Sequence, residues 1–290
     1  MKNTLVYSTL FTVFIALLSA CEDPIELDLG APVEQIVIDA VIDQTSDTQF
    51  IRITRSLPYL DNGNYKGYEM DSVGILDTSA MVFHKFTHKG DGVYFFVPPV
   101  PATFTIGNTY QLIARDGSDT YFSQSKLNAP TSIDSFTYAY KESGSFGGGK
   151  GNYVTLWAKD KPGKGDFYWF KLYRNDSLQA TAGDILIASD NSVTSGGSGD
   201  GELFIIPIRE NLTSRPYTSG ETARVEILCI TPELYYYLNL ISTQLNNQGL
   251  FAVPPSNIPS NIICINDQSK KVLGFFSMAG KVSTQKLLFP

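Results

Sequence analysis

The chain has 290 residues, of which 43% are hydrophobic, and its formal net charge is −7 at pH 7. This length is enough for two domains of ordinary size, and the hydrophobic content argues against a disordered chain. The negative charge argues against a nucleic-acid partner, because phosphate binding needs a basic face that displaces counterions. The 18 Phe and 16 Tyr are typical of chains that bury large flat side chains in β-sheets.

The N-terminus has the pattern of an export signal. Lys2 is the only charged residue before Glu22, and residues 5–18 are almost wholly apolar. The tetrapeptide "LSAC" that follows resembles a bacterial lipobox, in which small residues precede a cysteine whose thiol accepts a diacylglyceryl group. We therefore predict a signal peptide over residues 1–20 and lipidation at Cys21. The alternative is an uncleaved transmembrane anchor, because the run approaches the roughly 20 apolar residues that a spanning helix needs.

Residues 21–31 are predicted to form a lipidated tether. A lipoprotein carries two or three acyl chains, and each buried methylene contributes about 0.8 kcal/mol, so attachment is effectively permanent. Glu22 and Asp23 resemble the acidic signal that sends Bacteroidota lipoproteins to the outer face of the outer membrane. A solvated, extended tether is the alternative explanation of these acids. We predict an outer-membrane protein that is lipid-anchored and faces the cell exterior.

Apolar runs that alternate with turn signals follow the tether. "EQIVIDAVID", "QFIRITRSL", "AMVFHKF" and "GVYFFV" have the composition and period of strands. Asp116-Gly117 is a dipeptide of two-residue hairpin turns. The short spacing and the lack of a helical pattern predict an immunoglobulin-like antiparallel β-sandwich over residues 32–128. "NAPTSIDSF" then marks a boundary, where Pro130 interrupts the pattern.

Residues 129–290 are predicted to form a β-rich domain with one main α-helix. "NYVTLWAKD", "DFYWFKLYRND", "ARVEILCI" and "VLGFFSMAG" are expected strands. The helix begins after Thr231, which can cap it, with Pro232 at the first helical position, and it ends before Gly249. Its apolar face is expected to hold Leu234, Leu238, Ile241 and Leu245.

Several of these segments together resemble a known family. "NAPTSID", "KGDFYWFKL", "ITPELYYYL", "FAVPPSNIPSNI" and "VLGFFS" occur in this order behind the lipobox. The set resembles the Bacteroidota outer-membrane lipoproteins catalogued as domain of unknown function 4249. Members are often encoded beside TonB-dependent transporters, so the resemblance implies an accessory role in uptake without naming a ligand. Many members carry a further cysteine-containing tail, whereas this chain ends soon after its last strand.

Cys229 and Cys264 are the two cysteines of the mature chain besides the lipidated one. Both are flanked by apolar residues, in "VEILCI" and "NIICI". Export permits a disulfide between them, but a disulfide requires Cα atoms about 4.4 to 6.8 Å apart, which the sequence does not reveal. Two buried core thiols are the equal alternative.

A polar loop, "SDNSVTSGGSGDGEL", is the weak candidate for a cation site. Asp190, Asn191 and Asp200 could offer oxygen ligands to Ca²⁺, but the loop lacks the regular alternation of an EF-hand. Its serine and glycine content favours a solvated surface loop. We therefore predict no confident metal site.

The residues that support catalysis are scarce. His84 and His88 are the only histidines, and four strand residues separate them by roughly 13 Å, whereas zinc ligands lie about 2.1 Å from one ion. No Gly-x-Ser-x-Gly elbow is present, and "GSFGGGKG" lacks the Ser or Thr that a P-loop needs at Gly151. We predict no enzyme and no cofactor. A hydrolase that uses carboxylates alone stays open, because paired acids have no fixed spacing.

The leading functional hypothesis is an accessory or ligand-capture subunit of a TonB-dependent transporter. Its predicted partners are outer-membrane lipid, through Cys21, and the transporter, and its ligand is unknown. The alternative is a free-standing surface module that binds glycans or proteins. The three tyrosines at residues 235–237 suit a sugar platform, but aromatic residues beside an apolar helix face are more often packing.

Overall fold

The computed structural model of the chain describes residues 34–57, 63–100, 103–143, 148–189, 200–204, 206–210, 212–247 and 257–290. The predicted signal peptide and tether lie outside these residues. Glu34–Pro290 form one compact unit. The division at residue 128 therefore stays a prediction, and the strand pairing shows that the two parts share a strand.

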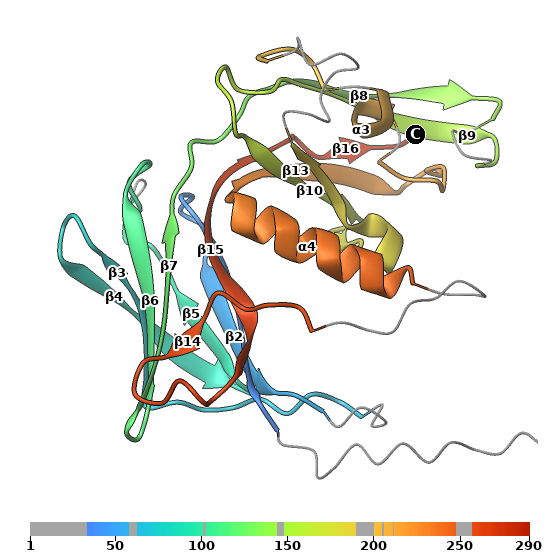
Figure 1. Cartoon of the computed structure of the whole chain (residues 1–290). Helices are drawn as coiled ribbons and strands as arrows, with labels where there is room; N and C mark the ends of the chain where they lie inside the picture. The colour runs from blue at the N-terminus through green and yellow to red at the C-terminus, as the bar shows by residue number, and fades with distance from the viewer. Residues whose placement is uncertain are drawn as a thin grey trace, which may run out of the picture. The chain divides into compact units, whose positions relative to one another are not determined.

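The unit is mainly β, as predicted (Figure 1). The first part contains β1 (Ile36–Asp43), β2 (Gln49–Arg55), β3 (Ser72–Asp77), β4 (Val82–Gly90), β5 (Val93–Phe96), β6 (Thr109–Asp116) and β7 (Asp119–Lys126). The second part contains β8 (Ile133–Lys141), β9 (Gly151–Ala158), β10 (Phe167–Arg174), β11 (Ser177–Leu178), η2 (Ala182–Asp184), β12 (Leu186–Ser189), α3 (Ile206–Glu210), β13 (Thr222–Ile230), α4 (Pro232–Leu245), β14 (Ile263–Cys264), β15 (Val272–Ser283) and β16 (Leu287–Leu288).

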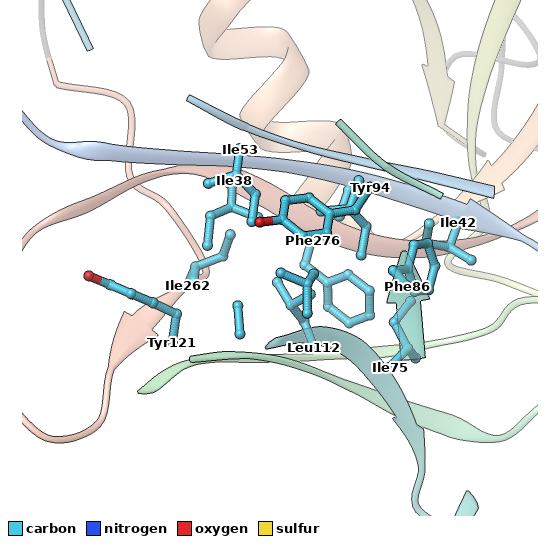
Figure 2. Packing of buried hydrophobic residues seen from close by; sticks show 14 of the residues in the cluster. Ile38, Ile42, Ile53, Ile75, Phe86, Tyr94, Leu112, Tyr121, Ile262 and Phe276 are labelled. Carbon is cyan, nitrogen blue, oxygen red and sulfur yellow. The ribbon is translucent and has the colours of Figure 1, made fainter. Parts of the chain in front are cut away.

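The first part folds as a β-sandwich, which confirms the predicted architecture. One layer contains β15, β1, β2 and β5, the other contains β3, β6, β7 and β14, and β4 pairs with strands of both layers. Inward-facing residues at every second position meet between the layers. Figure 2 shows Ile38, Ile53 and Tyr94 from one layer against Leu112 and Tyr121 from the other.

The long strand β15 joins the two parts. Its first eight residues pair with β1 in parallel, and residues 280–283 pair with β13 antiparallel. The sandwich therefore contains a parallel pair, where the sequence suggested antiparallel strands alone. C-terminal residues also complete the sandwich core, because Ile262, Cys264 and Phe276 pack in it.

Polar side chains form hydrogen bonds with backbone groups of β15 that lack a strand partner. Asn261 Nδ2 donates to Phe276 O at 2.7 Å, and Phe276 N donates to Asn261 Oδ1 at 2.9 Å. Ser125 Oγ accepts a hydrogen bond from Met278 N at 2.9 Å. Buried backbone groups need such partners, so these polar residues close the seam between the two layers.

The helix α4 begins where the sequence predicted. Thr231 Oγ1 accepts from Leu234 N at 3.4 Å, and Pro232 is the first helical residue. Leu234 and Leu238 are buried against β13, which lies beside α4 in Figure 1. The helix ends at Leu245, which is half exposed, and Gly249 lies outside the described residues. Within the described part of the chain, no helix is long and apolar enough to cross a membrane.

Candidate functional site at the open edge of β7

A pocket of about 590 Å³ lies where β7 meets the N-terminus of α4. The second half of β7 forms one wall, residues 231–233 form another, and Asn261 and Ile263 close the remaining side. The volume falls within the range of about 300 to 1,000 Å³ that small-ligand sites occupy. The pocket is therefore the candidate binding site.

The wall formed by β7 is a strand edge without a partner strand. The short strand β14 pairs with β7 only at Phe122 and Tyr121. Beyond Phe122, the residues described by the structure supply no further strand on this side of β7. An unpaired edge presents N–H and C=O groups that can bind another chain.

The direction of these backbone groups follows from the neighbouring hydrogen bonds. Ile265 N donates to Thr120 O on the β14 side, and Leu127 N donates to Asn108 O on the β6 side. Backbone groups alternate between the two sides of an antiparallel strand. Gln124 and Lys126 share the parity of Thr120, so their N–H and C=O groups point away from β6 and toward the open edge.

Some polar side chains of the pocket already serve the fold. Ser125 and Asn261 bind the backbone of β15, and Asn128 Nδ2 donates to Ile230 O at 2.9 Å. Ser123 differs, because it is 2% exposed and its Oγ has no hydrogen-bond partner among the described residues. A buried hydroxyl without a partner costs about 1 to 3 kcal/mol, so the Ser123 hydroxyl is the pocket group that gains most from a ligand.

Two exposed side chains of opposite charge line the same pocket. Lys126 ends β7 and Glu233 lies in the first turn of α4. Neither forms an ion pair with any residue in the described ranges. The pocket thus combines backbone donors and acceptors, a hydroxyl and one charge of each sign, which suits hydrogen bonding to a polar ligand.

A second groove of about 820 Å³ lies between α4 and the outer face of the sandwich. Asp39 and Arg52 from the sheet and Tyr237 from the helix line it. Leu57 and Asn257 border it, and each adjoins a segment outside the described residues. Its full boundary is therefore not described, so the pocket at β7 is the better defined site.

The family match covers most of the chain. A family profile with the description "Domain of unknown function (DUF4249)" matches residues 22–285. The chain belongs to this family. No curated protein matches it. The description of the DUF4249 family assigns no activity.

Cys229 and Cys264 are free thiols in this DUF4249 member. Cys264 is buried in the sandwich core and Cys229 in the core of the second part. The sequence left open a disulfide or two buried core thiols, and the structure has the two core thiols. Burial raises the pKa of the Cys229 thiol to about 12, which keeps it protonated and unreactive at neutral pH. Cys21 lies outside the described residues, so its lipidation stays a prediction.

The predicted cation loop is only partly described in this DUF4249 member. Asp190 and Asn191 lie outside the described residues, and Asp200 Oδ1 accepts from Gly163 N at 2.6 Å. The described residues contain no group of three or more His, Cys, Asp or Glu side chains that could hold a metal. A cation at this loop stays a weak prediction.

The histidines lie on β4, as the strand pattern predicted, in different surroundings. His84 packs against Phe96 and Phe104, and burial lowers its pKa. His88 Nδ1 lies 3.1 Å from Glu69 Oε1. His84 therefore has the contacts of a packed side chain, whereas His88 lies beside an exposed carboxylate.

Sequence reasoning missed the pocket residues Ser123, Gln124 and Lys126. The signal that could have indicated them is in "YFSQSK", where two serines occupy positions of the strand that face the core. Polar residues at core positions need partners. Ser125 has one in β15 and Ser123 has none in the described structure.

Proposed function

We propose that this DUF4249 member is a lipid-anchored protein of the outer membrane that acts as an accessory or ligand-capture subunit of a TonB-dependent transporter. The observation that carries the proposal is the lipobox-like "LSAC" behind an apolar run. Acylation of Cys21 would fix the protein to the membrane and leave residues 22–285, which the family profile matches, outside the signal peptide.

The short tether supports a role beside the membrane. Residues 22–31 span at most about 35 Å when extended, so the folded unit works close to its anchor. Confinement to a surface raises the effective concentration of any membrane partner, so a weak interface can be well occupied. The unpaired edge of β7 and the adjacent pocket offer such a partner, or its ligand, a place to bind.

The first experiment removes the lipid acceptor. We expect Cys21→Ala to abolish acylation and to move the protein from the membrane fraction to the soluble fraction. Metabolic labelling with a fatty acid and cell fractionation measure both effects. Cys264→Ala is the matched control, because it removes a buried cysteine and should stay acylated and membrane-bound. Acylation of the Cys21→Ala variant would disprove the assignment.

The second experiment tests the partner. We expect affinity purification after mild detergent extraction to recover a TonB-dependent transporter, identified by mass spectrometry, with the acylated protein. Crosslinking before extraction guards against dissociation in detergent. If crosslinked cells yield the acylated protein without a transporter, the free-standing binding module becomes the better proposal.

A further inference from the structure

We infer that the open edge of β7 binds an extended peptide segment, which adds to the sandwich as a further strand. The inference deepens the proposed function, because it assigns the segment to the transporter as its source. Peptides that add to a sheet edge gain affinity from backbone hydrogen bonds and specificity from pockets for alternate side chains. Both features occur at the second half of β7.

The backbone of β7 supplies the hydrogen bonds in the spacing of a strand. Asp116 pairs with Asp119 across the two-residue turn, and the register then continues to Lys126. The alternation that follows from this turn directs Gln124 and Lys126 to the open edge. Their N–H and C=O groups recur about every 7 Å, which is two residues of a strand. An extended peptide has the same repeat.

The position of β14 shows where the added strand would begin. Ile263 pairs with Phe122, so residue 261 would oppose Gln124 if the strand continued. Instead, both polar groups of the Asn261 side chain bind Phe276 in β15. The described chain thus leaves the edge at this point, and an added peptide would continue the line of β14 along β7.

The pocket supplies a second, independent indication of a ligand. Ser123 Oγ is buried without a partner among the described residues and lines the pocket. A carbonyl or side-chain oxygen of the peptide would accept its hydrogen bond. Lys126 and Glu233, with their opposite charges, favour a segment that carries one acidic and one basic side chain.

The test selects peptides and then examines how they bind. A randomised heptapeptide display library is selected on the wild-type protein and counter-selected on Gln124→Pro. Proline removes the N–H that points to the open edge, and an edge strand tolerates it because that N–H lies outside the β6 ladder. Gln124→Ala is the matched control, since it removes the side chain and keeps the N–H.

We expect synthetic copies of the enriched peptides to bind Gln124→Pro at least about tenfold more weakly than wild type, as for the loss of one hydrogen bond. Gln124→Ala should stay within about threefold. N-methylation of the peptide should weaken binding to wild type at alternate residues only, because only every second N–H of an added strand faces β7. This scan needs no folded variant, so it decides the matter even if Gln124→Pro unfolds.

Three results would overturn the inference: no enriched peptide, N-methylation without a two-residue alternation, or binding of oligosaccharides from a glycan panel in place of peptides. Failure of the inference about β7 is distinguishable from failure of the proposed function. If the transporter co-purifies equally with wild type and with folded Gln124→Pro, the edge is not the interface and the proposed function stands. If wild type recovers no transporter, the proposed function fails whatever the peptides do.

Discussion

Gly274→Ala should lower the free energy of unfolding by about 3 kcal/mol or more. Gly274 lies in β15 opposite Ile38 of β1, with φ of +87°. A left-handed conformation costs an alanine about 1 to 2 kcal/mol. A Cβ at this position would also lie 2.2 Å from Ile38 O, a backbone atom that cannot rotate away. The parallel pair that closes the sandwich would have to shift.

Urea unfolding at neutral pH, followed by tryptophan fluorescence, measures this effect. Gly149→Ala is the matched control, because its Cβ would meet no atom within 4 Å. We expect the control to change the free energy of unfolding by less than about 0.5 kcal/mol. A similar midpoint for the two variants would contradict the geometry of β15.

The features that the sequence predicts well are local. Thr231 and Pro232 mark the start of α4 because capping chemistry acts within one turn. The hairpin predicted at Asp116-Gly117 is confirmed, but its turn begins one residue later than predicted. Gly117, with φ of +56°, is the first central residue of the turn, and Asp116 pairs with Asp119 in the strand.

The features that the sequence does not predict depend on distant residues. The sequence predicts β15 as one apolar strand. Its partner β1 lies more than two hundred residues earlier in the chain, and nothing local to β15 identifies that partner. The open edge of β7 arises because β14 stops at Ile263 and Asn261 turns to β15. Single-strand periodicity reports which face of a strand is buried and carries no information on which edge is paired.

The ion pair between the buried Arg174 and the half-buried Glu221 offers the other large effect. Arg174 is 5% exposed, and its Nη1 donates to Glu221 Oε1 at 3.0 Å and to Oε2 at 2.9 Å. The guanidinium also stacks over the Tyr217 ring at 3.8 Å. We expect Glu221→Gln to lower the free energy of unfolding by about 3 to 5 kcal/mol, because the buried Arg174 would keep its charge without a counterion.

The pKa of Glu221 predicts how the loss of unfolding free energy in Glu221→Gln changes with pH. Burial by itself would raise the pKa of Glu221, but hydrogen bonds from Thr218 and Arg174 outweigh it and hold the pKa below its ordinary value. A carboxyl whose pKa is lower in the folded state stabilises the protein above the unfolded-state pKa, about 4.3 for Glu. That stabilisation disappears as pH falls through the folded-state pKa.

The difference in unfolding free energy between wild type and Glu221→Gln should therefore be constant near neutral pH and shrink below about pH 4.3. Urea titrations from neutral to acid pH measure it, provided that both proteins remain folded at the lowest pH. Glu202→Gln is the matched control, because Glu202 is exposed and forms no ion pair within the described part of the chain. Its difference from wild type should stay near zero throughout. A Glu221→Gln difference that stayed constant into acid would mean that the loss comes from packing or hydrogen-bond geometry, because neither of these contributions titrates, whereas the charge of Glu221 does.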